Sequence, residues 1–136
     1  MKTYELLEHT ADVGVKAYGE SVAEAFSHAA EAMFDIITDK SRIESVGQCD
    51  IELEAPDLEQ LLVDWLSKLL FLNGADNLVF GKFHVTLKGT HLTAQVHGEQ
   101  YDTKKHKIGV EIKAVTYHML QVHEEKPVFV QVLFDI

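Results

Sequence analysis

Two acidic groups stand together at the end of the sequence. The hydrophobic stretch from Val128 to Ile136 predicts a strand, which would deliver Asp135 and the α-carboxylate of Ile136 to one place. Neighbouring carboxylates repel each other unless a cation or a group of donors lies between them. These residues therefore favour the binding of a hard divalent cation, and we expect that chemistry at this end of the chain.

A further carboxylate that could join them lies near the N-terminus, in His9-Thr10-Ala11-Asp12-Val13-Gly14. Short polar segments of this kind are commonly turns, in which Asp and Thr bond the local backbone. The alternative is an oxygen-ligand site in which Asp12 meets Asp135 and the Ile136 carboxylate. The sequence contains no EF-hand loop, so such a site must be assembled from distant segments.

Other residues with chemical potential give weaker predictions. His84, His91 and His97 are spread over a predicted hairpin, and no HExxH or CxxC spacing accompanies them, so a structural zinc site is not expected. Cys49 has no base beside it in the sequence, and no glycine-rich phosphate loop occurs. Lys104-Lys105-His106-Lys107 is a basic island, which is either a solvated loop or a contact for an acidic partner surface.

Composition limits the classes of function. The 136 residues are 46% hydrophobic and 25% charged, which is typical of one globular domain, and we expect a single domain over residues 1–136. The net charge of −10 opposes direct, strong binding to nucleic acid, so a role near RNA would run through a protein partner. No apolar run approaches the roughly 20 residues of a membrane span. The single cysteine suits a reducing cytoplasm, where we expect the protein.

Two helices are predicted in the first half of the chain. Alternation predicts strands over residues 13–18 and 49–54. Ser21 and Glu24 form a capping box before an apolar stripe that continues to Ile37. Asp57 and Gln60 repeat the cap before a second apolar stripe through Leu70, and Asn73-Gly74 is the expected stop.

The second half of the chain predicts strands only. Residues 79–87 and 92–101 form an expected hairpin that turns at 88–91, and a long strand is expected over 110–122. Glu124-Glu125-Lys126-Pro127 then turns the chain into the last strand. The predicted fold is α+β, a two-layer sandwich in which two amphipathic helices pack on one face of a predominantly antiparallel sheet.

Several of these segments together resemble the archease family. The resemblance covers the whole chain in order and is carried by His9–Gly14, Ala17-Tyr18-Gly19, Glu24-Ala25-Phe26, Trp65-Leu66, Leu69-Leu70-Phe71-Leu72, Gly98-Glu99, His106, Ile112-Lys113-Ala114-Val115-Thr116-Tyr117-His118 and Phe134-Asp135-Ile136. The string from Ile112 to His118, taken with both ends of the chain, is highly specific. The fold that the resemblance implies is a sheet with two helices packed on it.

The resemblance also implies a function and a site. Archeases are accessory proteins, not enzymes, that assist the RtcB-type, GTP-dependent RNA ligase of tRNA splicing and RNA repair by promoting its guanylylation and repeated turnover. The family's metal site corresponds to Asp12, Asp135 and Ile136 and is usually described with Ca²⁺, with Mg²⁺ or Mn²⁺ as alternatives. Supporting roles are expected for four further residues: His9, His106, Lys113 and Thr116.

Two other functions stay open from the sequence. The family resemblance also allows a chaperone-like role toward RNA-modifying enzymes such as a tRNA methyltransferase. A stand-alone metal-dependent hydrolase would use the carboxylates around a divalent ion to activate water, with a histidine such as His9 as base. The absence of a recognised phosphate-binding loop and of a basic RNA groove argues against the hydrolase.

Overall fold

A computed structural model describes residues 3–9 and 12–136 of the chain, with backbone alone at Glu8 and His9. The elements follow one another as β1 (Tyr4–His9), β2 (Asp12–Tyr18), α1 (Val22–Ile37), the short 3-10 helix η1 (Lys40–Arg42), β3 (Gly47–Glu54), α2 (Leu58–Asp76), β4 (Leu78–Lys88), β5 (His91–Gln100), β6 (Ala114–His123) and β7 (Phe129–Asp135).

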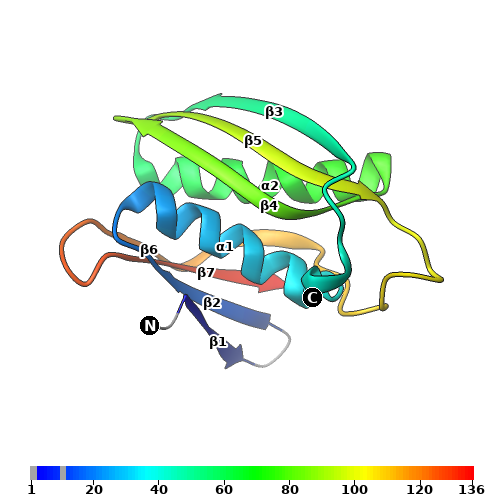
Figure 1. The fold of residues 1–136 in the computed structure, drawn as a ribbon. Helices are drawn as coiled ribbons and strands as arrows, with labels where there is room; N and C mark the ends of the chain where they lie inside the picture. The colour runs from blue at the N-terminus through cyan, green and yellow to red at the C-terminus, as the bar shows by residue number, and fades with distance from the viewer. Residues whose placement is uncertain (1–2, 10–11) are drawn as a thin grey trace.

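The strands form two antiparallel sheets. Four strands pair in the order β1-β2-β7-β6, and three pair in the order β3-β5-β4. Figure 1 shows α1 and α2 lying between the two sheets. The predicted α+β class, with two helices packed against antiparallel strands, is confirmed. The predicted two layers with one sheet are wrong, since a second sheet covers the other side of the helices.

The burial of the helices explains the extra layer. In α1 the fully buried residues include Ala25 and Ala32 in addition to the predicted stripe, so apolar side chains face more than one direction. In α2 the indole of Trp65 is fully buried and its Nε1 donates to the carbonyl oxygen of Phe26 at 3.0 Å, which fastens the two helices together. A helix that is apolar on two sides needs cover on both.

Local side-chain caps begin both helices as predicted. The Ser21 hydroxyl accepts from the backbone N–H of Glu24 at 3.1 Å, and the Asp57 carboxylate accepts from that of Gln60 at 2.7 Å. The predicted stop of α2 at Asn73-Gly74 is wrong. The helix continues to Asp76 and ends at Asn77, whose backbone is left-handed (φ 57°), a conformation that asparagine tolerates at a helix end.

The strands of the second half differ from the prediction mainly in β6. The hairpin over β4 and β5 turns at residues 88–91 as expected, with Gly89 at φ 61°. The long strand expected from Val110 begins only at Ala114. The backbone N–H groups of Gly109 and Val110 donate instead to Ile37 and Ile36 carbonyl oxygens, at 3.0 and 2.9 Å, and so cap the end of α1.

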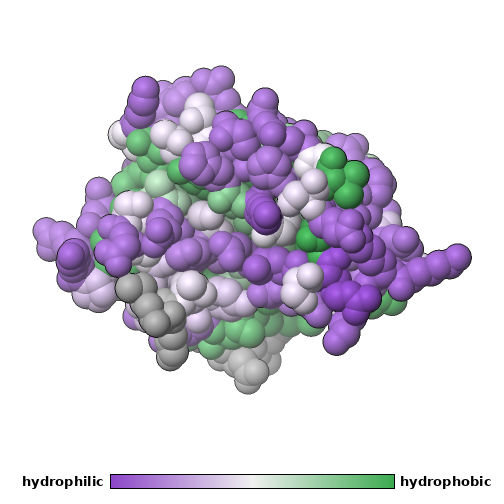
Figure 2. All heavy atoms as spheres, viewed as in Figure 1, coloured by the Kyte–Doolittle hydropathy of each residue, from purple (hydrophilic) through white to green (hydrophobic). Residues whose placement is uncertain are grey.

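The exterior is largely hydrophilic in the view of Figure 2, in keeping with a net charge of −10. Within the described part of the chain, no helix has both the length and the apolar character needed to cross a lipid bilayer. The apolar residues concentrate around the two helices, where the inner faces of both sheets meet them.

Candidate functional site

Strand pairing places two carboxylates next to each other. Asp12 at the start of β2 lies directly opposite Asp135 at the end of β7. Residues directly opposite in an antiparallel pair project from the same face of the sheet, within reach of each other. Phe134 points into the core, so the alternation of side chains puts Asp135 and Asp12 on the outer face. Asp12 is half-buried and Asp135 is exposed, which leaves both accessible to water.

Ile136 follows Asp135 directly, and its half-buried side chain packs against the edge of the core. Its main-chain oxygens are therefore adjacent in sequence to Asp135, the residue that pairs with Asp12. The structure thus brings together the segments from which the sequence predicted a site. Like charges directly opposite each other destabilise a sheet, and a bound cation would turn that repulsion into attraction.

The donors favour a hard cation. Within the described residues no group of three or more His, Cys, Asp or Glu side chains is arranged to hold a metal. A cation held by these two carboxylates would need main-chain oxygens or water to complete its shell, a donor set that suits Ca²⁺ or Mg²⁺ and not a closed zinc site. The backbone of His9 pairs with Asp12 in the β1–β2 register, while its side chain is outside the described part of the chain.

Strand β7 lies between β2 and β6, and Lys113 and Thr116 are on its β6 side, away from Asp12. The backbone N–H of Lys113 donates to the carbonyl oxygen of Asp135 at 2.7 Å, which fixes the position of the acidic residue. Ala114 lies opposite Asp135 and Thr116 opposite Leu133, so Thr116 is two residues along the same face. The Thr116 hydroxyl accepts weakly from the N–H of His118 at 3.3 Å.

His106 belongs to a different cluster, within the loop of residues 101–113. Its Nδ1 accepts from the backbone N–H of Asp102 at 2.9 Å, so Nε2 carries the proton and donates to Glu99 at 3.0 Å. The ring is buried and stacks on Tyr101, with centroids 5.7 Å apart. Both ring nitrogens are already engaged, and the contacts of His106 hold the loop in place.

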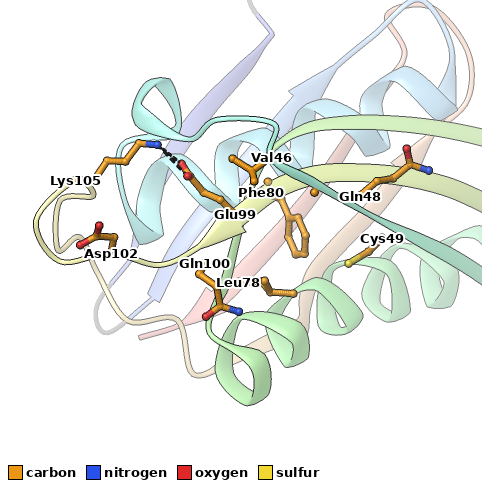
Figure 3. Close-up of a pocket in the computed structure, with 11 residues that line it drawn as sticks. Val46, Gln48, Cys49, Leu78, Phe80, Glu99, Gln100, Asp102 and Lys105 are labelled. Carbon is orange, nitrogen blue, oxygen red and sulfur yellow. Dashed lines mark hydrogen bonds and ion pairs between the residues drawn. The ribbon is translucent and has the colours of Figure 1, made fainter.

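Glu99 is the centre of this cluster, and Figure 3 shows its ion pair with Lys105. Its carboxylate is mostly buried and accepts from the Glu44 backbone N–H at 2.8 Å, from Lys105 Nζ at 2.8 Å and from His106. Burial would raise the pKa of Glu99, but the donors from Glu44, Lys105 and His106 outweigh it and lower that pKa to about 2. Glu99 is therefore an anion that ties residue 44 and the loop to β5.

The basic island is partly structural. Lys105 Nζ also pairs with Glu44 at 3.2 Å, and the Lys107 carbonyl oxygen accepts from the Thr38 hydroxyl at 2.6 Å. These contacts favour the interpretation of the island as a loop anchored to the fold. Figure 3 shows the adjacent pocket of about 640 Å³, which Lys105, Glu99 and Cys49 help to line.

The three hairpin histidines share one surface without forming a site. His84, His91 and His97 alternate with core residues of β4 and β5, so they lie on the outer face of the three-stranded sheet. His91 Nε2 lies 2.8 Å from the carboxylate of Glu52, an exposed pair. The sequence alone did not place these three residues, and the structure shows them on the surface.

Comparisons with known proteins agree with this architecture. Residues 4–136 match the model of the Archease protein family (MTH1598/TM1083). The chain is 47% identical to "Protein archease" of Methanosarcina barkeri over 126 residues, 89% of this chain and 86% of the relative, and 41% identical to "Protein archease" of Pyrococcus furiosus, 90% and 89%.

A solved structure shares the whole fold. The solution structure of Methanobacterium thermoautotrophicum protein 1598 aligns over 100% of both chains, with a TM-score of 0.88 and 37% sequence identity. The family match over nearly the entire chain, the identity to several relatives and the shared fold lead to one conclusion. The chain belongs to the archease family.

Proposed function

We propose that this protein is a cytoplasmic accessory factor of an RtcB-type, GTP-dependent RNA ligase and promotes guanylylation and repeated turnover of that ligase in tRNA splicing and RNA repair. Membership of the archease family supports an accessory role. The observation that carries the proposal is the register of β2 and β7, which sets Asp12 directly opposite Asp135. An acidic pair of this kind is suited to a divalent cation.

The proposed ligands are the carboxylates of Asp12 and Asp135 and the α-carboxylate of Ile136. Ca²⁺ is the preferred ion because it accepts irregular oxygen ligands and water, and Mg²⁺ or Mn²⁺ are alternatives. A divalent cation held there would supply positive charge near the phosphate oxygens of a nucleotide. The N–H of Lys113, bonded to the Asp135 carbonyl oxygen, would hold the acidic strand end in position.

The charge of the molecule supports a protein partner over RNA itself. A net charge of −10 repels phosphates, whereas a ligase needs a basic surface to hold its RNA. An acidic accessory protein would be attracted to that basic surface, and the attraction would increase the rate of association.

The test is ligase guanylylation with GTP in a Ca²⁺ buffer, with and without this protein. Asp12→Asn and Asp135→Asn should each remove most of the stimulation, whereas Asp50→Asn, which alters an exposed carboxylate on β3, should retain it. Adding two glycines after Ile136 should also reduce stimulation, because the α-carboxylate is displaced. Full stimulation by both site variants would refute the metal-site proposal, and RNA cleavage by the protein alone would favour a hydrolase.

A further inference from the structure

Three exposed apolar side chains lie on α2 and on the loop of residues 101–113. Phe71 on α2 is 61% exposed, and Ile108 and Val110 in the loop of residues 101–113 are 84% and 42% exposed. Single apolar residues on a surface are ordinary, but a group beside a functional site marks an interaction surface. The three side chains form a group, and not three separate exposed residues, only if they lie at the same end of the molecule.

Their contacts place them at that end. Ile108 and Val110 line a pocket of about 230 Å³ together with Asn73 and Asn77, at the end of α2. Phe71 lines a second pocket, of about 330 Å³, with Lys113 and Ala114. The backbone of Lys113 bonds to Asp135, and Ala114 lies opposite Asp135 in the sheet. Ile108 and Val110 therefore precede, and Phe71 lies against, the residues 113–114 that pair with Asp135 through the backbone. Figure 1 shows α1 and α2 ending on the same side of the molecule as β7.

The loop that presents Ile108 and Val110 is held at several points. The N–H groups of Gly109 and Val110 bond to the last carbonyls of α1, and the Thr38 hydroxyl bonds to the carbonyl oxygen of Lys107. An isoleucine left 84% exposed on an anchored loop contributes little to folding. A loop that is already ordered loses little conformational entropy when a partner covers it.

We propose that Phe71, Ile108 and Val110 form an apolar rim that docks against a partner protein. The complementary surface of that partner has an apolar depression beside basic side chains. The basic part of that surface complements Asp12 and Asp135, and the chain's charge of −10 disfavours RNA or an anionic membrane as the occupant. The identity of this partner as the RNA ligase rests on the proposed function.

The chain offers a matched control for the rim. Tyr117 is 61% exposed, as Phe71 is, and the exposed fraction of Met119, 44%, is similar to the 42% of Val110. The Tyr117 hydroxyl accepts from Gln60 in the first turn of α2, about 16 Å along the helix from Phe71 at 1.5 Å per residue. The double variants Phe71→Ser/Val110→Ser and Tyr117→Ser/Met119→Ser thus remove similar exposed apolar area at different places.

The experiment measures the Kd of each double variant for an RtcB-type ligase by calorimetry, after circular dichroism has shown that both fold. The rim variant should raise Kd by about tenfold or more, because buried aromatic contacts dominate interfaces, while the control should stay within about twofold of the parent. Equal affinities of the parent and the rim variant would overturn the rim, as would equal losses in both variants.

Two outcomes separate this inference from the proposed function. A parent protein that binds and stimulates the ligase, with a rim variant that binds equally well, would overturn the rim alone. Self-association in sedimentation that the rim variant abolishes would assign the surface to a second copy and would also overturn it. A parent that neither binds nor stimulates the ligase would overturn both proposals.

Discussion

At the scale of single residues, we expect the Asp12–Asp135 pair to destabilise the fold without a cation and to stabilise it when a cation is bound. In EDTA, Asp135→Asn relieves repulsion between directly opposed like charges and should stabilise the fold by roughly 0.2–1 kcal/mol. In millimolar Ca²⁺ the parent protein should instead become the more stable of the two, because an ion that binds only the native state shifts the unfolding equilibrium toward it.

Urea unfolding in the two buffers measures both effects. Asp50→Asn is the matched control, since Asp50 lies opposite Gln95 and not opposite another acid. Its stability relative to the parent should be the same in EDTA and in Ca²⁺. If Asp135→Asn is as responsive to Ca²⁺ as the parent, the ion binds elsewhere.

The lowered pKa of Glu99 predicts that the stability of the fold depends on pH. Its pKa falls from an ordinary 4.5 to about 2 on folding, so the stability it contributes is present above pH 4.5 and is lost as the pH falls through about 2. Glu99→Gln should cost about 2 kcal/mol at neutral pH, because the hydrogen bonds to Lys105 and His106 lose their charged acceptor. The difference between parent and variant should stay constant down to about pH 4.5 and shrink as the pH falls from there toward 2.

Unfolding by urea at a series of pH values from neutral to about 2 tests this. Glu125→Gln, in the exposed turn before β7, should change the stability by less than about 0.5 kcal/mol at every pH. A Glu99→Gln deficit that is independent of pH would show that the charge of Glu99 is not what stabilises the cluster.

At the scale of elements, the junction between the loop and α1 depends on a close backbone approach. A Cβ added at Gly109 would lie 2.3 Å from the carbonyl oxygen of Ile36 and 2.6 Å from that of Ile37. Gly109→Ala should therefore destabilise the fold by roughly 1–3 kcal/mol, since the two groups must move apart and weaken the cap of α1.

Gly74 in α2 is the counterpart, because nothing lies within 4 Å of a Cβ added there. Gly74→Ala should stabilise the protein by roughly 0.5–1 kcal/mol, the usual preference for alanine in a helix. Thermal unfolding of the two variants, monitored by circular dichroism, should show shifts of opposite sign. A Gly109→Ala variant that is as stable as the parent would mean that the close approach at Gly109 does not constrain this junction.

Elements whose cause is local could be predicted from the sequence. The caps at Ser21 and Asp57 and the hairpin turn around Gly89 depend on neighbouring residues, so the local pattern contains them. The strand expected from Val110 was wrong because Val110 and Ile112 alternate like a strand, while the amides of residues 109 and 110 are used elsewhere. Alternation does not say where a backbone hydrogen bond goes.

Features that depend on distant pairing were beyond the sequence. Period-2 patterns identify strands but not which strands share a sheet, so the division into two sheets was missed. The residues alone left the meeting of Asp12 and Asp135 as an alternative to a local turn, and the family resemblance implied it; only the register places the two residues opposite each other. Nothing in the sequence joins Glu44, Glu99 and Lys105, which are brought together by the loop of residues 101–113.

At the scale of the whole molecule, the candidate site joins the two ends of the chain. Strand β7 lies between β2 and β6 in its sheet, so the last strand completes a sheet that begins with the first residues. Bringing together segments so far apart in sequence costs loop-closure entropy, which the contacts of the rest of the fold offset. The carboxylate pair is therefore a property of the complete fold, and neither end of the chain can make it alone.

The hydrogen bonds that cap α1 also allow the opening of the loop of residues 101–113 to be measured. The amide protons of Gly109 and Val110 are held by the carbonyls of Ile37 and Ile36, so they exchange with deuterated solvent only when the loop separates from the helix. Exchange at these two positions reports the frequency of that opening without any label on the protein. A partner that covers the rim would slow it, and a partner that docks elsewhere would leave it unchanged.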